Sequence, residues 1–540
     1  MSTSMTRFRR GYERSVNSIE ESVKFLERRY TPLGRFSPGP FQGWGFLWQP
    51  ALVGFVALTA ILAGASFSNS PFKLETPHTW FFGVPTQPVK VAAPTNEMTL
   101  ILGIVLVFGG LFLLMRVWLR LAEVMRMHQG APLSSMWKIL GLWSIPMIIA
   151  PPLFSRDVFS YAAQGEMTAR HITPYLNGPF SLGSGPFVTP VDPLWGNVPA
   201  PYGPFFLFLD SSVVRITGHR ELWSVVGLRV LEVLATVLLG VGLVMLARAL
   251  NRDPGEAFVL GALNPLVLLT LIGGAHNDAL MAGFLVIGIA FAVQKRPILG
   301  IVFCATAAAI KAPAALGIIY IAWTWLGPGH RVREKVRPMV VAGAITGVIL
   351  VVFTTLAGFG FGWVKNLATP GTVRSWSAPA TGSAMLIHWL LNSFGISIAL
   401  TPILTVTRLV GLAAAVLISI WLLWNAEQRG WVRSLGLSLV LFVVLGPVVQ
   451  PWYLVWGLVL LAASYVGREH FWLLALTIVS PFLGLPAGQA LLRGLIHLNA
   501  AAMIGCVAIL LSTILIPMGD WTQWSWQEVT IREQHPLDAG

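Results

Sequence analysis

Charged side chains are scarce in this sequence. Only 11% of its 540 residues are Asp, Glu, Lys or Arg, whereas 55% are hydrophobic and the mean hydropathy is +0.71. A soluble domain carries about 25% charged residues. The composition therefore excludes an ordinary soluble protein and predicts an all-α polytopic membrane protein, in which length counts membrane spans rather than soluble domains.

Cysteine and several catalytic signatures are also missing or rare. The two cysteines, Cys304 and Cys506, both lie inside apolar segments, which excludes a disulfide framework and a thiolate metal site. The chain has no P-loop, no GxSxG and no HExxH, so the corresponding nucleotide-binding, hydrolase and metalloprotease classes are excluded. The first fifty residues are polar and basic without an apolar h-region, so we expect no cleaved signal peptide.

The charge that is present has a pattern. The net charge of +13 comes mostly from Lys and Arg in short segments between apolar runs, which is typical of cytoplasmic loops and argues against nucleic acid as a partner. Such segments (RALNRDPGE, QKRP, GHRVREKVRP, NAEQRGWVR and VGRE) alternate with segments that lack this excess (GGAHND, the corner at Lys311, and VVQPWY). The alternation predicts about fourteen spans in a plasma membrane, with both termini cytoplasmic.

These patterns divide the chain into a cytoplasmic basic tail (1–49), a transmembrane domain (50–518) and a cytoplasmic tail (519–540). The spans are predicted near 51–69, 99–116, 138–154, 223–248, 257–272, 279–293, 298–311, 313–327, 339–358, 403–425, 434–450, 452–466, 471–486 and 499–517. The longest segment between spans, 155–222, is rich in Gly, Pro and aromatic residues, and we expect it to form juxtamembrane helices on the outer leaflet. A second outer loop is predicted at 359–383.

Polar residues gather in the loops that this count places outside. Ionisable groups near a membrane are costly, which makes them candidates for function. The outer side holds acids, a histidine, amides and cations together, and the site is therefore expected there: Arg156, Asp157, Asp192, His276, Asn277, Asp278, Lys311, Lys365, Arg374 and Gln450.

Asp157 is the first candidate. Pro151 and Pro152 end the preceding helix, Ser155 is a suitable N-cap, and Asp157 then lies in the first turn of a new helix. On that helix Asp157, Tyr161 and Gln164 share one face. A catalytic carboxylate and a first-turn acid that complements the helix dipole, paired with Arg156, are both open readings.

The other polar candidates also have two readings each. In GGAHNDAL, Asn277 or Asp278 could cap a helix, or the group with His276 could bind sugar hydroxyls. Lys311 and Arg374 could extend to the membrane interface or meet a phosphate. Asp157, Asp192 and Asp278 carry the oxygen ligands that a divalent metal takes, and their spacing argues neither for nor against one; no cofactor is predicted.

Six segments together resemble a known family: FSRDVFSYAAQGEM, ITPYLNGP, VDPLWGNVPAPYGP, NPLVLLTLIGGAHNDALM, AAAIKAPA and QPWY. In this order they are similar to the actinobacterial polyprenol-phosphate-mannose-dependent α-1,6-mannosyltransferases, membrane glycosyltransferases of the GT-C class. The resemblance covers about residues 50–500, and the VDPLWGN…PAPYGP segment resembles the B-type branch more than the A-type.

The resemblance implies a GT-C-type helix bundle with its site on the outer face. It implies a polyprenyl-phosphate-mannose donor and a mannosylated phosphatidylinositol-type glycolipid acceptor, for the α-1,6-mannan backbone of lipomannan and lipoarabinomannan. The essential acid of the first long outer loop matches Asp157. His276, Asn277 and Asp278 would contact sugar or support the site, and Lys311 would bind phosphate.

The expected chemistry needs one carboxylate. A glycosidase uses two because it protonates a poor leaving group, whereas a polyprenyl phosphate leaves as a stable anion. One base for the acceptor hydroxyl is then enough, with Lys311, Arg374 or Arg156 near the phosphate. Trp195, Tyr202 and Trp376 suit sugar stacking or interfacial anchoring. Two alternatives stay open: a lipid-linked sugar flippase or transporter, and a GT-C enzyme for another polyprenyl-linked sugar such as arabinose.

Overall fold

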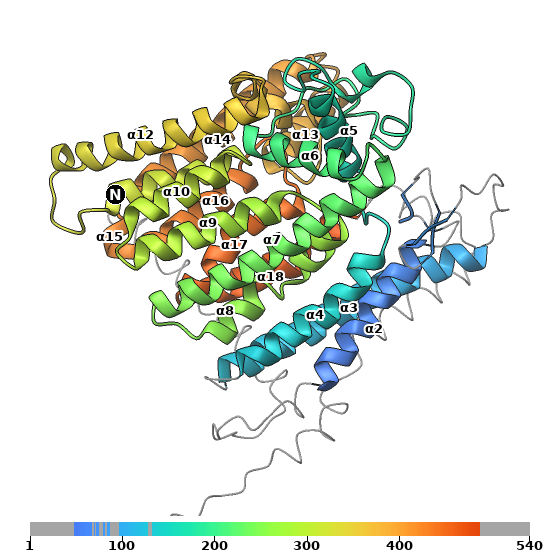
Figure 1. Ribbon diagram of the computed structural model, residues 1–540, viewed down its shortest axis with the longest axis horizontal. Helices are drawn as coiled ribbons and strands as arrows, with labels where there is room; N and C mark the ends of the chain where they lie inside the picture. Colours follow the sequence, from blue (N-terminus) through green and yellow to red (C-terminus); the bar gives the residue numbers. More distant parts are fainter. Residues whose placement is uncertain are drawn as a thin grey trace, which may run out of the picture. The chain divides into compact units, whose positions relative to one another are not determined.

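Helices make up nearly all the regular structure of the computed structural model (Figure 1). The structure describes residues 48–66, 70, 72–74, 79–81, 84–86, 97–127 and 132–485. Within these residues the strands are β1 (Thr79–Phe81) and β2 (Val84–Thr86), which form one antiparallel hairpin. The helical prediction is confirmed for the remaining elements. The predicted span at 499–517, the tail 519–540 and nearly all of the tail 1–49 lie outside the described residues.

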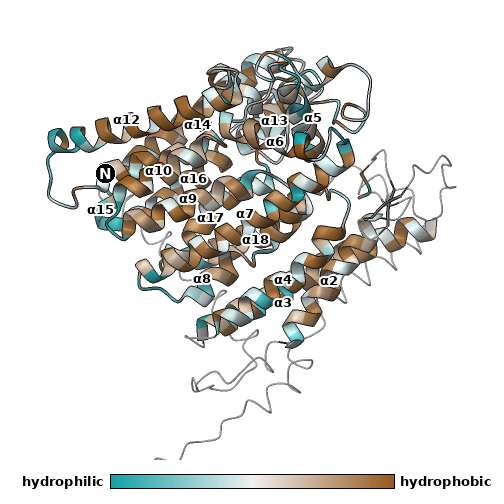
Figure 2. Ribbon diagram, viewed as in Figure 1, coloured by the Kyte–Doolittle hydropathy of each residue, from teal (hydrophilic) through white to brown (hydrophobic). Residues whose placement is uncertain are grey.

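Five of the described helices are long and apolar enough to cross a membrane. Each matches a predicted span, and the chain is therefore a multi-pass membrane protein. In α12 and α14 only 11% and 17% of the most apolar window is buried inside the protein, which leaves that apolar surface for lipid (Figure 2). The five are α2 (Trp48–Ser66), α3 (Glu97–Met127), α7 (Glu221–Ala249), α12 (Val332–Ala357) and α14 (Leu400–Trp424).

The other predicted spans correspond to shorter apolar helices. At 1.5 Å per residue, the 17 residues of α4 cover about 26 Å, less than the roughly 30 Å of a bilayer core. The count of fourteen spans therefore stays a prediction. The shorter apolar helices are α4 (Leu133–Ile149), α10 (Pro297–Ala308), α11 (Ala315–Thr324), α16 (Trp431–Val444), α17 (Pro451–Ser464) and α18 (Glu469–Leu483). Two other short helices are α8 (Pro254–Gly261), which overlaps the predicted span 257–272, and the polar α15 (Ala426–Arg429), which lies between predicted spans.

A sharp bend interrupts the chain between the π-helix η3 (Val267–Gly273) and α9 (Asp278–Val293). The two helices meet at an angle of 117°. The bend is tight enough that Ala275 takes a positive φ of 53°, which L-residues with a Cβ rarely adopt. At this bend His276 and Asn277 lie outside the regular helices, where their side chains can serve a site.

Glycines bring two of the central helices into close contact. A Cβ added to Gly288 of α9 would lie 2.8 Å from the carbonyl oxygen of Gly300 in α10, and the reverse distance is also 2.8 Å. Small residues at such crossings let helix backbones approach, which favours packing where there is no water to drive it. The two helices therefore form a tight pair behind the bend.

The predicted outer segment 155–222 folds into short elements. These are α5 (Asp157–Ala169), the 3-10 turn η2 (Pro179–Leu182) and α6 (Pro204–Ile216). The run FFLFLDSSVV lies in α6, whose 13 residues reach only about 20 Å, in agreement with the prediction that it does not span. In α5, Gly165 leaves room for close packing on α6, because a Cβ there would lie 2.7 Å from the carbonyl oxygen of Asp210.

The second predicted loop, 359–383, is more helical than expected. It contains the 3-10 element η5 (Gly362–Thr372), and α13 (Pro379–Ser393), which is not among the predicted spans, begins within it. The Asn366 side chain of η5 donates hydrogen bonds to the carbonyl oxygens of Tyr175 and Ala200, both at 3.0 Å. The two outer segments are thus tied to each other.

Candidate active site

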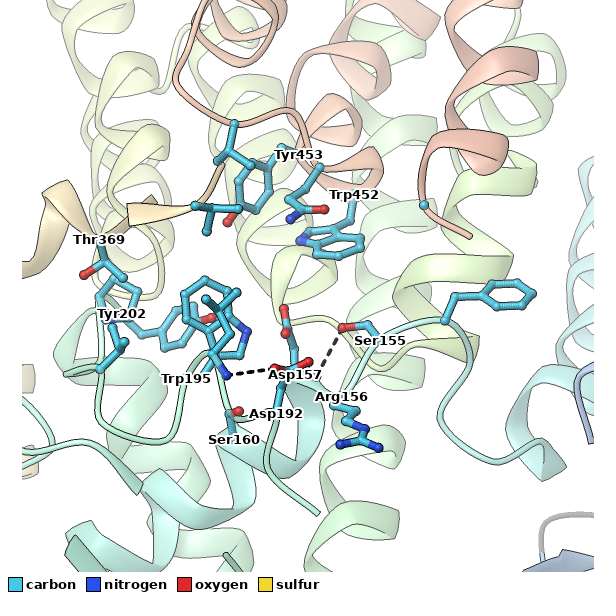
Figure 3. Close-up of a pocket in the computed structure, with 18 of the residues that line it drawn as sticks. Ser155, Arg156, Asp157, Ser160, Asp192, Trp195, Tyr202, Thr369, Trp452 and Tyr453 are labelled. Carbon is cyan, nitrogen blue, oxygen red and sulfur yellow. Dashed lines mark hydrogen bonds between the residues drawn. The ribbon is translucent and has the colours of Figure 1, made fainter. Parts of the chain in front are cut away.

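A cavity of about 390 Å³ opens among the polar segments (Figure 3). Its lining comes from six separate stretches of chain: Leu74, the start of α5, the segment 192–202, η5 and the residues after it, the start of α17, and the end of α18. The predicted topology puts all six at the outer side of the membrane. In the structure they converge on one end of the helix bundle, which we call the site end.

Asp157 lies in the middle of this lining (Figure 3). It is the first residue of α5, whose N-cap is Arg156 rather than the predicted Ser155. Ser155 still contributes, because the backbone N–H of Asp157 donates a 3.2 Å hydrogen bond to Ser155 Oγ just before the helix begins. The Asp157 side chain is 17% exposed. Burial raises the pKa of the Asp157 carboxyl above its ordinary value, which makes it a stronger base than an exposed aspartate.

The face of α5 that carries Asp157 presents further polar atoms to the cavity. Ser160 and Gln164 both line it. Ser160 Oγ and Gln164 Oε1 are buried and have no hydrogen-bond partner among the described residues. Buried polar atoms are costly when unpaired, so both suit the hydroxyls of a bound ligand. Tyr161, predicted on the same face, is instead buried and packs edge-on against the ring of Tyr202 at 5.2 Å.

His276 lies directly behind Asp157. Its Nε2 atom is 3.6 Å from Asp157 Oδ2, and its side chain is 1% exposed. Its Nδ1 atom is 2.7 Å from the carbonyl oxygen of Thr270. The Trp452 ring, which lines the cavity, stacks on the imidazole with ring centres 3.8 Å apart. The bend thus supplies a histidine that is fixed on three sides.

Backbone contacts hold the segments before Asp157 and His276 together. The N–H of Leu153 donates to the carbonyl of Gly273 at 2.9 Å. Arg229 of α7 donates to the carbonyls of Ala150 and Gly273. These bonds join the end of α4 to the end of η3, and the two side chains meet as a consequence.

Lys311 and Asp278 form a buried ion pair beside the cavity. Lys311 Nζ lies 2.9 and 2.8 Å from the two Asp278 oxygens, and the side chains are 11% and 0% exposed. The indole N–H of Trp456 donates to Asp278 Oδ1 at 2.5 Å. Lys311 Nζ also lies 4.6 Å from the ring centre of Tyr453 and 5.7 Å from that of Tyr202, both of which line the cavity. Asn277 Oδ1 is 3.4 Å from the same ammonium.

Arg156, Asp192 and Trp195 all line the cavity, as the sequence predicted for a shared site. Asp192 Oδ1 accepts a 2.9 Å hydrogen bond from the Leu194 N–H, which shapes the loop. In Figure 3 the Arg156 side chain points away from the side of the cavity formed by Trp452 and Tyr453.

Arg374 and Trp376 are placed differently. Both are exposed and neither lines the cavity, although their neighbour Val373 does. The chain around Val373 is held by Arg408 of α14, which donates to the carbonyls of Gly371 and Val373 at 2.6 Å each and to Thr381 Oγ1 at 2.9 Å. Sequence reasoning missed Arg408, because an arginine inside an apolar run gives no hint of its loop partners.

Two of the three aspartates considered as metal ligands already accept hydrogen bonds from other groups. Asp278 is engaged by Lys311 and Trp456, and Asp192 by its own turn. In the part of the chain that the structure describes, no three His, Cys, Asp or Glu side chains converge in a way that could hold a metal ion.

Several lining residues were not predicted individually. Ser160, Thr369, Trp452 and Tyr453 all line the cavity. The signal for three of them was present. Trp452 and Tyr453 lie in QPWY (450–453), one of the segments that carried the resemblance, and Ser160 follows Asp157 by three positions on the same helix. Thr369 had no such signal.

Two family models match this chain. The alpha-(1->6)-mannopyranosyltransferase N-terminal domain matches residues 51–327, and the MptB C-terminal domain matches residues 380–514. The first range contains Asp157, His276 and Lys311, and the second contains Trp452. The second model is of the B type, as the VDPLWGN…PAPYGP segment predicted.

Characterised relatives bear similar names. An alpha-(1->6)-mannopyranosyltransferase A of Mycobacterium tuberculosis is 30% identical over 83% of this chain and 84% of its own length. An alpha-(1->6)-mannopyranosyltransferase B of Corynebacterium glutamicum is 30% identical over 72% of this chain and 68% of its own. A probable alpha-(1->6)-mannopyranosyltransferase of Mycolicibacterium smegmatis is 34% identical over 66% and 69%.

No solved structure matches this chain. The family assignment therefore rests on sequence. The cavity around Asp157 is the candidate active site for the activity of that family. The chain belongs to the alpha-(1->6)-mannopyranosyltransferase family, and it is a mannosyltransferase.

Proposed function

We propose that this enzyme transfers mannose from a polyprenyl-phosphate-mannose donor to an α-1,6-mannan glycolipid acceptor at the extracytoplasmic face of the plasma membrane. The observation that carries the proposal is a buried carboxylate, Asp157, in a cavity at one end of an apolar bundle. A lipid-linked donor could keep its tail in the bilayer and enter such a cavity with its sugar. The catalytic unit is then the transmembrane domain predicted at 50–518.

In the proposed reaction the acceptor hydroxyl oxygen attacks C1 of mannose. The C1–phosphate bond breaks with its electron pair leaving on the phosphate, and C1 is inverted. The hydroxyl proton passes to Asp157, whose burial and raised pKa suit a general base. No general acid is needed, since the leaving phosphate is already a stable anion.

The other cavity residues have supporting roles in this proposal. The unpaired Ser160 Oγ and Gln164 Oε1 would bind sugar hydroxyls, and Trp195 and Tyr202 would stack on sugar rings. Arg156 is the cation on the cavity lining that would meet the phosphate. Lys311 is paired with Asp278, so it would act on the phosphate from behind Tyr202 and Tyr453 rather than as an unpaired point charge.

The test is donor turnover by purified Asp157→Asn, with Asp192→Asn as the matched carboxylate on the same cavity. We expect Asp157→Asn to lower kcat by about 10²–10⁴-fold with a folded protein, and Asp192→Asn to affect KM more than kcat. Wild-type turnover in folded Asp157→Asn would overturn the assignment of the base. Transfer from a polyprenyl-phosphate-arabinose donor in preference to the mannose donor would overturn the substrate.

A further inference from the structure

We propose that His276 is the positioning partner of the base: its Nε2 atom accepts a hydrogen bond from Asp157 once Asp157 has taken the acceptor proton. This inference rests on the proposed function of Asp157 and adds a specific role for a residue of the bend.

The tautomer of His276 is set by its neighbour. Nδ1 lies 2.7 Å from the carbonyl oxygen of Thr270, and a carbonyl can only accept. In the neutral ring Nδ1 therefore carries the proton, and Nε2 has a lone pair. Nε2 is buried and has no hydrogen-bond partner among the described residues. A buried acceptor without a donor is a costly arrangement, unless a proton arrives during the reaction.

The group that would bring this proton is Asp157. Its Oδ2 lies 3.6 Å from Nε2, which is within about 1 Å of hydrogen-bond contact. Such contacts are often long in a site without substrate and shorten when the substrate is bound. A carboxylate and a lone pair facing each other repel, whereas a carboxylic acid and a lone pair attract. A neutral imidazole with its lone pair toward Asp157 therefore favours Asp157 with a proton and makes Asp157 a better base, whereas a charged imidazolium would lower the pKa of Asp157.

Other charged groups near the pair offset one another. Asp278 and Lys311 act on both Asp157 and His276, and they form their own ion pair at 2.8 Å. The remaining titratable neighbours of Asp157 are Tyr161, Tyr202 and Tyr453, which are neutral phenols at working pH. The Trp452 ring covers one face of the imidazole and adds no charge.

The proton balance of the step follows. The acceptor O–H bond breaks, its electron pair stays on the oxygen that bonds to C1, and the phosphate leaves with the electron pair of the old C1–O bond. The proton moves to Asp157 and is held between Oδ2 and Nε2 until it passes to solvent. His276 donates nothing to the substrate, and its effect is exerted through Asp157.

His276→Asn isolates this role. An asparagine amide can keep the N–H bond to the Thr270 carbonyl but has no atom at the place of Nε2. We expect kcat to fall by about 10–100-fold and the acid limb of the kcat/KM profile to move about one pH unit lower, because the base loses the partner that favours its proton. In an Asp157→Asn background the same change should have little further effect.

His388→Asn is the matched control. His388 also places Nδ1 near a backbone carbonyl, that of Ile398 at 2.9 Å, but it is partly exposed and does not line the cavity. Its pH profile should equal that of the wild type. An unmoved acid limb in a folded His276→Asn protein would overturn the inference while leaving Asp157 as base, whereas wild-type turnover in Asp157→Asn would overturn both.

A second measurement tests the same pair without the His276→Asn protein, in case that variant does not fold. In wild-type enzyme with ¹⁵N-labelled histidine, one ring should show a protonated Nδ1 and an unprotonated Nε2, and its Nε2 signal should titrate together with Asp157. In Asp157→Asn that titration should disappear. A protonated Nε2 at the pH of maximal activity, or a titration unchanged in Asp157→Asn, would contradict the proposed pair.

Discussion

The two ends of the bundle hold similar polar groups in different surroundings. Helix α17 begins at the cavity with Trp452 and ends beside Tyr465, so it connects the site end to the opposite end. We call that opposite end the basic end; it holds the ion pairs Arg433–Glu469 and Lys335–Glu427, as well as the contact from Tyr465 to Glu256. Teal residues gather there, around α15 and the start of α12 (Figure 2).

The difference lies in what surrounds the charges. At the basic end at least one member of each ion pair reaches water: Arg433 and Glu469 are 22% and 18% exposed, and Glu427 is 21% exposed although its partner Lys335 is 7% exposed. At the site end Lys311 and Asp278 are 11% and 0% exposed and are enclosed by aromatic rings. Ion pairs of the same kind therefore anchor loops at the basic end and help to shape the cavity at the site end. Three predictions test this comparison.

The largest effect is expected from Asp278→Asn. It leaves Lys311 charged and buried without its partner, which we expect to lower the free energy of unfolding by about 3–5 kcal/mol and to impair turnover. Glu469→Gln, the matched change at the basic end, should cost about 1 kcal/mol or less. Thermal and denaturant unfolding in detergent would measure both.

The comparison would fail if the two variants lost equal stability. A Lys311→Met background makes the test more specific. In that background Asp278→Asn leaves no buried cation unpaired, so it should lower the free energy of unfolding much less. Equal costs of Asp278→Asn in both backgrounds would show that the ion pair contributes little.

A smaller effect is expected from Arg408→Gln. Arg408 holds the carbonyls of Gly371 and Val373, and Val373 lines the cavity. Releasing this loop should raise KM for the donor by about tenfold with a smaller change in kcat. Arg433→Gln at the basic end should leave KM as it is, and steady-state kinetics on both proteins would show the difference. A KM unchanged in Arg408→Gln would mean that the loop does not shape the cavity.

The smallest effect is expected from Asp210→Asn, on the buried face of α6. Burial, with the neighbouring Glu232 carboxyl second, raises the pKa of Asp210 well above its ordinary value, which favours the neutral, protonated carboxyl. Asn is also neutral and should keep turnover within about twofold. A raised pKa in the folded state means that wild-type stability falls as pH rises above about 4, where the unfolded aspartate ionises.

Asn has no such dependence on pH. The melting temperature of Asp210→Asn relative to wild type should therefore be more favourable at pH 8 than at pH 4. A difference that does not vary between these pH values would show that Asp210 is ionised in the folded protein.

Much of the fold could be predicted from composition and period. The apolar runs that became α2, α7, α12 and α14 are long and contain few charged residues, and few other structures satisfy their backbone groups in lipid. The helix α13 was missed because its residues Pro379–Ser393 mix Thr, Ser, His and Asn with apolar side chains, which gives neither a membrane span nor a clear loop.

The sequence could predict which residues are candidates for the site, but not which of them contact one another. Asp157 and His276 were both candidates, but 118 intervening residues give no information on a distance of 3.6 Å. Lys311 was expected to meet a phosphate, and the structure gives it an aspartate from the same protein, 33 positions earlier. Arg374 and Asp192 looked alike as polar loop residues, and only Asp192 lines the cavity.

The sequence by itself determined that this protein is a multi-pass membrane protein of a mannosyltransferase family, because hydropathy and the order of motifs are properties of segments. The tertiary structure decided which of its polar residues meet. A tautomer, an ion pair and a cavity depend on atoms from distant segments within a few ångströms of one another. Those separations come from the 117° bend before α9 and from the carbonyls that Arg229 joins.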